Sequence, residues 1–216
     1  MQYEFVKRLI DIVGSLVLLI IFSPIMIVVS FIIIATSYGP ILIERSSVHS
    51  IRAGKNGRRF RIYKFRSMVL DAERILKTDP KYRKLYKKYK ESSFKLLKDP
   101  RITPIGRFIR KHSIDEMPQL FNVLKGEMSI VGPRAYLPEE IEEQQKKYPQ
   151  TKRLVKEMLK VKPGITGFWQ VSGRSEVNFD KRIEMDAYYA RKKSILLDVL
   201  VLMKTPWAMI SGKGAI

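Results

Sequence analysis

The sequence predicts a mostly α-helical α/β fold in which one compact domain follows an amino-terminal membrane element. A chain of 216 residues has room for one domain of ordinary size plus a membrane segment. An apolar run without any charged residue extends from Ile12 to Ile43. Beyond it, short alternating stretches mix with segments of helical periodicity, and no repeat or low-complexity linker separates them.

The apolar run is expected to enter a membrane, because its length exceeds the ~20 residues that a helix needs to cross the hydrocarbon core. It is too long for the apolar part of a signal peptide, and Asp11 stands at its start. Pro24 follows Ser23 in mid-run, where proline removes a backbone donor, so the helix should bend or break there.

Basic residues flank the run on both sides. Lys7 and Arg8 precede it and an arginine-rich stretch follows it, and such flanks prefer the cytoplasm, so both ends are expected on one side. Spanning helices also tolerate proline. The residues alone therefore leave a spanning helix and a re-entrant hairpin equally open.

The segment Phe60–Arg66 alternates apolar and basic residues, which predicts a short strand with Lys64 and Arg66 on one face, presented to anions. From Asp71 to Leu97, apolar residues recur at helical spacing among lysines and tyrosines. This pattern predicts a helical excursion that is solvated or faces lipid.

Asp115 and Glu116 form an acid pair inside the basic segment from Arg110 to Arg134. Neighbours on an α-helix point roughly 100° apart, so the two side chains are not expected to face the same way. Ser113 could instead cap a helix, with Glu116 completing a capping box. Against that structural reading, the surrounding cations are expected to keep both carboxylates ionised. One could then attack a phosphorus while the other holds a divalent cation.

Arg134 ends the turn Val131-Gly-Pro-Arg134, and its planar guanidinium suits a phosphate. The alternative is an arginine with no role beyond the turn, which the same sequence pattern would allow. Gly173-Arg174 is likewise either a second guanidinium near phosphate or a surface turn.

The remaining segments are predicted as follows. Pro138–Leu159 reads as a helix or helix pair broken near Tyr148-Pro149, and Phe168–Val171 reads as a short strand. Asp180–Lys192 should be helical, with Arg182, Asp186 and Tyr189 in one stripe. Ile195–Ile210 is too interrupted to span and should lie in the membrane interface, with Lys204 snorkelling and Trp207 at headgroup depth.

Composition limits the chemistry. The net charge of +20 and the pI near 10.1 call for an acidic partner, and nucleic acid, anionic lipid and a phosphorylated substrate all qualify. The absence of cysteine excludes disulfides, thiolate zinc sites and cysteine nucleophiles. The histidines, His49 and His112, are too few for a histidine-rich metal site.

The sequence closely resembles the bacterial sugar transferase family, the monotopic phosphoglycosyl transferases, from Lys7 to about Trp207. Five motifs in the family's order carry the resemblance: Phe5-Val-Lys-Arg-Leu-Ile-Asp11, Ile62-Tyr-Lys-Phe-Arg-Ser-Met68, Ser113-Ile-Asp-Glu-Met-Pro-Gln-Leu-Phe-Asn-Val-Leu-Lys-Gly126, Val131-Gly-Pro-Arg134 and Lys162-Pro-Gly-Ile-Thr-Gly-Phe-Trp-Gln-Val171.

The resemblance implies an architecture. Residues 1–40 would form a re-entrant helix hairpin broken at Ser23-Pro24, and residues 41–216 a catalytic domain with interfacial helices. The domain would sit on the cytoplasmic face of the bacterial inner membrane. The chain resembles the compact members, without a large amino-terminal membrane domain.

The resemblance also implies a reaction, the transfer of a sugar 1-phosphate from a UDP-sugar to undecaprenyl phosphate with release of UMP. Asp115 would be the nucleophile and Glu116 would help to coordinate Mg²⁺. Lys64, Arg110 and Arg134 would hold the diphosphate or the lipid phosphate, and Asp186 would activate the acceptor or support the metal. The sugar is expected to be galactose or glucose, and N-acetylated sugars also remain open. The oligomeric state is left open as well, and a homodimer is one alternative.

Two departures from the family pattern concern substrate detail. Ala135 stands where a second proline is usual, and the loop Arg45–Gly54 is longer and more basic than expected. A non-enzymatic adaptor that binds anionic lipid or nucleic acid would explain the charge and the apolar run. It gives no reason for Asp115 and Glu116 between arginines, and we do not expect a nucleic-acid partner.

Overall fold

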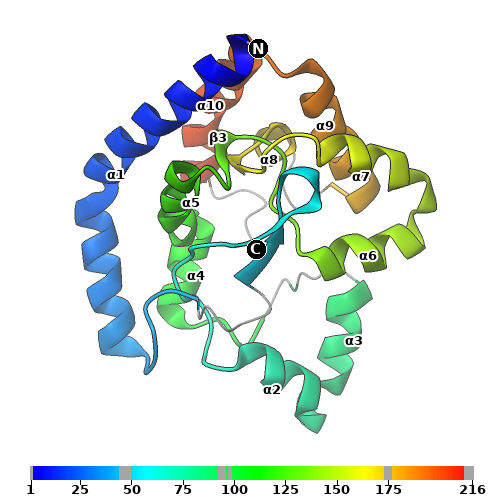
Figure 1. The fold of residues 1–216 in the computed structure, drawn as a ribbon. Helices are drawn as coiled ribbons and strands as arrows, with labels where there is room; N and C mark the ends of the chain where they lie inside the picture. The colour runs from blue at the N-terminus through cyan, green and yellow to red at the C-terminus, as the bar shows by residue number, and fades with distance from the viewer. Residues whose placement is uncertain (1, 44–49, 92–95, 97–98, 173–176, 212–216) are drawn as a thin grey trace.

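The structure, a computed structural model, describes residues 2–43, 50–91, 96, 99–172 and 177–211. Within these residues the fold is mostly helical, with short strands between the helices (Figure 1). The α-helices are α1 (Gln2–Thr36), α2 (Ala72–Thr78), α3 (Arg83–Glu91), α4 (Pro104–Lys111), α5 (Leu120–Lys125), α6 (Pro138–Lys147), α7 (Lys152–Met158), α8 (Phe168–Ser172), α9 (Phe179–Lys192) and α10 (Ile195–Ser211). The strands are β1 (Ile51–Ala53), β2 (Arg59–Arg61), β3 (Ser129–Val131) and β4 (Gly164–Thr166).

Helix α1 is one continuous helix, and it is long and apolar enough to cross a membrane by length and composition. Most of its large apolar side chains are exposed, among them Phe5, Ile20 and Phe31. The predicted break at Ser23-Pro24 is not present, because the helix continues through Pro24. Figure 1 shows that α1 changes direction part-way along its length, which agrees with the expected bend.

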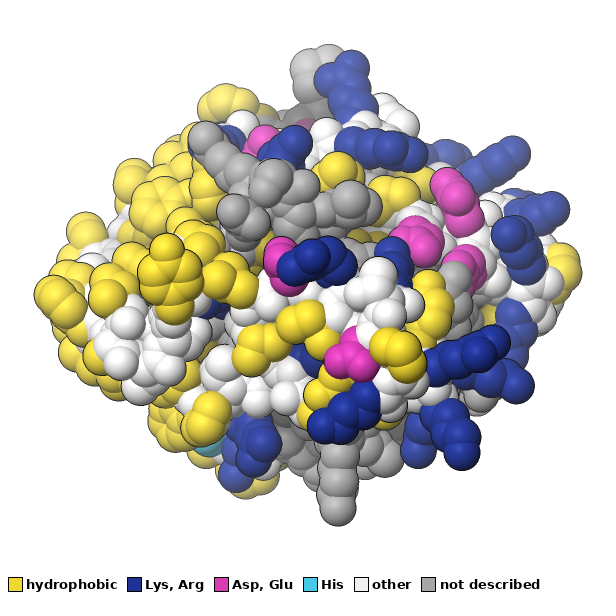
Figure 2. Space-filling model, turned by 90° about the horizontal axis from the view of Figure 1, so that it is seen from below, with side chains coloured by type: hydrophobic (Ala, Val, Ile, Leu, Met, Phe, Trp, Pro, Cys, Tyr) yellow, Lys and Arg dark blue, Asp and Glu magenta, His cyan; other side chains and the backbone are white. Residues whose placement is uncertain are grey.

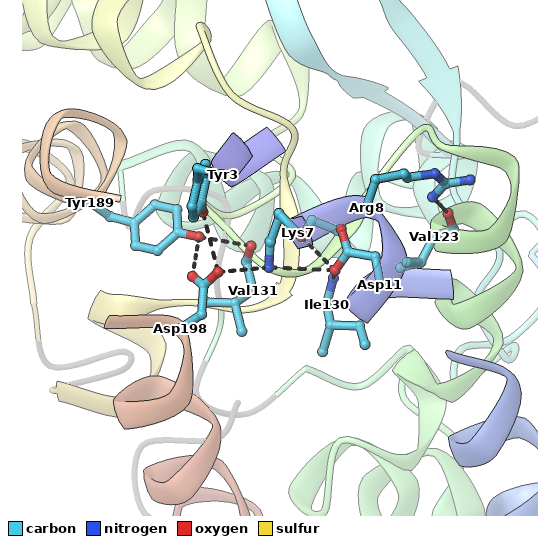
Figure 3. A network of polar contacts seen from close by, with 10 residues as sticks. Tyr3, Lys7, Arg8, Asp11, Val123, Ile130, Val131, Tyr189 and Asp198 are labelled. Atoms are coloured by element: carbon cyan, nitrogen blue, oxygen red, sulfur yellow. Dashed lines mark hydrogen bonds and ion pairs between the residues drawn. The ribbon is translucent and has the colours of Figure 1, made fainter. Parts of the chain in front are cut away.

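The polar start of α1 is fastened to the rest of the domain by a buried network (Figure 3). Lys7 lies between two carboxylates, 3.4 Å from Asp11 and 3.1 Å from Asp198 on α10. Asp11 accepts hydrogen bonds from Ser129 Oγ and Ile130 N of β3, each at 3.0 Å. The first motif therefore attaches α1 to β3 and α10.

Asp198 is the centre of this network. Besides the ion pair with Lys7, it accepts hydrogen bonds from the hydroxyls of Tyr189 at 2.6 Å and Tyr3 at 3.2 Å. We expect Asp198→Asn to destabilise the fold by about 1–3 kcal/mol, because Tyr189 and Tyr3 lose a charged acceptor and Lys7 keeps only its ion pair with Asp11. Thermal unfolding in nanodiscs measures this. The matched control is Asp71→Asn, whose exposed pair with Arg74 should contribute no more than ~1 kcal/mol. Equal shifts in the two variants would contradict the prediction.

Two small sheets complete the fold. β1 pairs with β2 antiparallel, and β3 pairs with β4 in parallel, with Ser129 opposite Gly164 and Val131 opposite Thr166. Gly132 and Gly164 allow the two chain segments to approach closely. A Cβ built at Gly164 would lie 2.1 Å from the backbone nitrogen of Gly132. The backbone of the Gly-Pro-Arg turn thus packs closely against the Lys162–Val171 motif.

Most predicted helices are confirmed. The broken helix pair appears as α6 and α7, the stripe of Arg182, Asp186 and Tyr189 is buried on α9, and α10 matches Ile195–Ile210. Asp71–Leu97 forms α2 and α3 within its described part. The Phe60–Arg66 strand is shorter than expected, because β2 ends at Arg61. The strand predicted at Phe168–Val171 is wrong: those residues form α8.

Gly173-Arg174, His49 and the first part of the loop Arg45–Gly54 lie outside the described residues.

The surface is divided between apolar and basic regions. Figure 2 shows hydrophobic side chains gathered on the side of α1 and Lys and Arg side chains gathered on the opposite side. On α10, Leu196, Met203, Trp207 and Ile210 are more than 70% exposed. A membrane-embedded surface made of α1 and α10 is consistent with this division.

Candidate active site

The acid pair lies on a short 3₁₀ helix, η4 (Ile114–Gln119), rather than on an α-helix. Ser113 precedes it in the left-handed region at φ 57° and its side chain makes no capping hydrogen bond, so the capping-box alternative is wrong. α4 leads into this turn, and α5 follows it directly. Asp115 and Glu116 are thus held in a tight, irregular segment between two helices.

Lys64 brings the two carboxylates together. Its Nζ lies 2.9 Å from Asp115 Oδ2 and 3.2 Å from Glu116 Oε1. The segment that carries Lys64 runs beside η4, because the backbone nitrogen of Phe65 donates to the carbonyl of Asp115 at 2.9 Å. Both acids therefore face one cation, although their spacing on an ideal helix would point them apart.

Burial and charge act differently on the two carboxyl groups. Burial raises the pKa of Asp115, which is 2% exposed, and Glu116 adds to that rise while Lys64 opposes it. Burial also acts on Glu116, but the cations Lys64 and Arg134 outweigh it and lower its pKa. The cations therefore favour the ionised form of Glu116, whereas at Asp115 burial and the Lys64 ammonium shift the pKa in opposite directions. Neighbouring acids with pKa values driven apart are suited to different roles.

Arg134 follows the Gly-Pro turn and stacks on aromatic rings. Its guanidinium carbon lies 5.9 Å from the ring centres of both Tyr136 and Trp169. The guanidinium carbon of Arg182 lies 5.1 Å from the ring centre of the same Trp169. Such stacking fixes the plane of a guanidinium while leaving its edge for an anion. Trp169, which belongs to the fifth motif but was not singled out from the sequence, is thus a support for Arg134.

Asp186 lies behind this turn and is fully buried on α9. Its Oδ2 accepts hydrogen bonds from the Tyr136 hydroxyl at 3.1 Å and the Arg134 backbone nitrogen at 3.4 Å. Burial raises the pKa of Asp186 to about 8, despite these two hydrogen bonds and the nearby arginines. Its contacts place it in support of the Arg134 turn.

Because its pKa is raised in the folded state, Asp186 makes the stability of the fold depend on pH. Between about pH 4 and pH 8 the folded state binds the proton and the unfolded state releases it, so stability should fall as pH rises through this range. Asp186→Asn keeps an acceptor for Tyr136 without a titrating group, and it should be the more stable form at pH 8 and flatten the decline. Melting temperatures of both forms at pH 5 and pH 8 test this. A parallel decline in both would contradict it.

A cavity of about 590 Å³ opens beside the acid pair. Its charged lining residues are Lys64, Arg110, Asp115, Glu116 and Arg134. All five were predicted as site residues, whereas the predicted Asp186 does not line the cavity. The remaining wall is largely apolar and comes from segments far apart in sequence. It includes Leu18 and Phe22 of α1, Ile165 of β4, Trp169 of α8, and Leu202, Pro206, Met209 and Ile210 of α10.

The donors available for a metal are few. Among the described residues, no group of three or more His, Cys, Asp and Glu side chains could hold an ion. Glu116 is partly exposed, its carboxylate is kept ionised, and it borders the cavity. Mg²⁺ commonly uses one or two carboxylates and takes its other ligands from substrate phosphates and water, so this donor set fits it.

Comparisons with known proteins support one family. Residues 2–212 match the family model described as bacterial sugar transferase. The chain is 43% identical over 216 residues to the undecaprenyl-phosphate galactose phosphotransferase of Salmonella typhimurium, covering 98% of this chain and 42% of that protein. It is 37% identical to the UDP-glucose:undecaprenyl-phosphate glucose-1-phosphate transferase of Klebsiella pneumoniae, with 97% and 41% covered.

A third relative has a similar length. The chain is 34% identical to the exopolysaccharide production protein ExoY of Sinorhizobium fredii, covering 97% of this chain and 87% of that protein. The chain thus spans less than half of the first two relatives but most of the third.

Proposed function

Because the chain belongs to the bacterial sugar transferase family, we propose that it transfers a sugar 1-phosphate from a UDP-sugar to undecaprenyl phosphate and releases UMP. The reaction would be the first membrane step in the assembly of a glycoconjugate such as an exopolysaccharide. Galactose and glucose are the proposed sugars, since they occur in the names of two relatives.

The cavity is the observation that carries this proposal. Its polar part holds two carboxylates and three cations, which suit a diphosphate, and its apolar part is lined by α1 and α10. Both helices carry exposed apolar residues outside the cavity as well. A lipid phosphate requires this combination, because its head must reach the charged groups while its chain stays in an apolar environment. A soluble acceptor would not need the apolar wall.

In the proposed first step, Asp115 attacks the phosphorus that carries the sugar. A bond forms between a carboxylate oxygen and this phosphorus, and the bond to the bridging oxygen breaks, so UMP leaves with the electron pair. The ionised form is needed for attack, and Lys64 favours that form by opposing the effect of burial on the pKa of Asp115. The phosphosugar stays bound to Asp115 as an acyl phosphate.

In the proposed second step, an oxygen of undecaprenyl phosphate attacks the same phosphorus and Asp115 leaves. The acceptor is already anionic near neutral pH, so no strong base is needed. Glu116 would hold Mg²⁺, which supplies charge neutralisation at the phosphate oxygens when bound. Arg110 and Arg134 would bind phosphate oxygens, and Asp186 would act indirectly by holding the Arg134 turn.

The same architecture supports a monotopic placement on the cytoplasmic face of the inner membrane. Arg8, near the start of α1, donates to the carbonyls of Val123 and Leu124 at 2.6 and 2.7 Å. Just beyond the other end of α1, the nitrogen of Ile43 donates to the carbonyl of Lys64 at 2.8 Å. Both ends of α1 therefore contact one domain, which favours a helix that enters the bilayer and returns to the same side.

The test is a transfer assay with the protein held in nanodiscs. A panel of UDP-sugars would be offered with undecaprenyl phosphate and Mg²⁺, and UMP and the lipid-linked product would both be measured. We expect UMP release with one sugar that depends on the lipid and is lost when EDTA removes the cation. Binding of anionic lipid without turnover of any sugar would instead support the membrane adaptor.

A further inference from the structure

The segment that follows α1 and the segment that carries Lys64 are joined by backbone hydrogen bonds. The nitrogen of Arg66 donates to the carbonyl of Ile41 at 2.8 Å, in register with the bond from Ile43 to Lys64. Leu42 and Phe65 face each other across this short antiparallel bridge. Since the nitrogen of Phe65 also donates to the carbonyl of Asp115, the segment after α1, the Lys64–Arg66 segment and the acid pair are joined in turn by backbone hydrogen bonds.

The side chain of Arg66 strengthens this connection. Its Nη2 donates to the carbonyls of Ser37 at 2.8 Å and Gly39 at 3.2 Å, and its Nη1 donates to the carbonyl of Tyr38. Arg66 is 7% exposed. These three carbonyls directly follow α1, whose last turn contains no basic residue. Arg66 thus supplies the cation that stabilises a helix carboxyl end.

This geometry differs from the sequence prediction for the second motif. The alternation of the Phe60–Arg66 segment predicted that Lys64 and Arg66 would both face anions. Lys64 does contact the two carboxylates, whereas Arg66 turns to backbone carbonyls at the end of α1. The two cations of one motif therefore have different partners, one in the cavity and one at the membrane helix.

We propose that Arg66 is a positioning residue that couples the end of α1 to the acid pair by holding the Lys64–Arg66 segment in place. This inference rests on the proposed function wherever activity is measured. A guanidinium binds three carbonyls through a flat fork, which an ammonium cannot reproduce. Arg66→Lys keeps the charge and loses the fork, so the Lys64–Arg66 segment should shift and the Lys64 ammonium should lie farther from Asp115 and Glu116.

A double-mutant cycle in the transfer assay tests the coupling. Per folded protein, Arg66→Lys should lower kcat about 10-fold, because small misplacements of catalytic groups have large effects. In the Lys64→Met background the same change should cause little further loss, since residues that act through one another are not additive. Arg61→Lys, an exposed change on the same segment, is the control and should keep wild-type activity. A full additional loss in the double variant would overturn the proposal.

A second measurement does not need turnover. Acetic anhydride labels lysines according to their accessibility and protonation, and mass spectrometry quantifies each site. Lys64 should react more slowly than the exposed Lys87 in the wild type, and faster in Arg66→Lys than in Arg61→Lys. Unchanged labelling of Lys64 would overturn the proposal. If no sugar phosphate is transferred by the wild type, the proposed function fails while this measurement still decides the role of Arg66.

Discussion

Replacing Asp115 with Asn is expected to abolish the transfer of sugar phosphate, with kcat reduced by about 10⁴-fold or more. An amide of the same shape has no anionic oxygen to attack phosphorus. Asp115 is 2% exposed and adjoins the cavity beside Lys64 and Glu116, so the substituted amide would stand at the position from which the carboxylate attacks. UMP release and lipid-linked product, measured separately in nanodiscs, should both disappear.

The covalent intermediate gives an independent readout. Without undecaprenyl phosphate, the wild type should gain the mass of one phosphosugar when incubated with the UDP-sugar, and Asp115→Asn should not. The matched control is Glu116→Gln, which alters the neighbouring acid but keeps the nucleophile, so slow labelling should remain. If Asp115→Asn still transferred sugar phosphate to undecaprenyl phosphate at a rate comparable to that of Glu116→Gln, the two-step mechanism would be wrong. Direct attack by the lipid phosphate on the UDP-sugar would then replace it.

Local sequence patterns predicted the longer elements well. The apolar run became α1, the pattern around Tyr148-Pro149 became α6 and α7, and α9 buries the predicted stripe. These elements depend on periodicity and on proline, both of which act within one segment. The error at Phe168–Val171 arose because aromatic residues and valine favour strands in general, whereas here the strand is the preceding Gly164–Thr166.

The composition of the site was predicted from the sequence, but its arrangement was not. The motifs pointed to Lys64, Arg110, Asp115, Glu116 and Arg134, and the structure places these residues around one cavity. Spacing on an ideal helix argued that the two acids diverge. They converge because the 3₁₀ turn differs from an α-helix and because Lys64 comes from a distant segment.

Two other features of the site could not be predicted from the sequence of any single segment. The apolar wall depends on how α10 packs beside α1, which the buried contacts of Asp198 with Tyr3 and Lys7 establish. The position of Asp186 behind the Arg134 turn is likewise a long-range contact. Tertiary packing determines both, and no periodicity within a segment reports them.

Replacing Lys64 with Met should have the second largest effect. Lys64 is the cation shared by Asp115 and Glu116, and its loss leaves two adjacent carboxyl groups without their ion-pair partner. Breaking a buried ion pair typically costs about 3–5 kcal/mol. Part of that cost can be relieved by protonation, so the pKa of Asp115, already raised by burial, should rise further. We expect kcat at pH 7 to fall about 10²-fold or more.

The pH dependence identifies the cause of that loss. If Lys64 acts by keeping Asp115 ionised, the acid limb of the kcat profile should move to higher pH in Lys64→Met, and raising the pH should recover part of the activity. Lys64→Arg keeps a cation between the acids and should retain more activity, with its acid limb close to that of the wild type. A uniform loss across pH in Lys64→Met would show instead that Lys64 serves mainly to bind substrate phosphate. The direction of the shift is decisive, because Lys64 is the cation with the largest influence on the pKa of Asp115 and directly contacts its carboxylate.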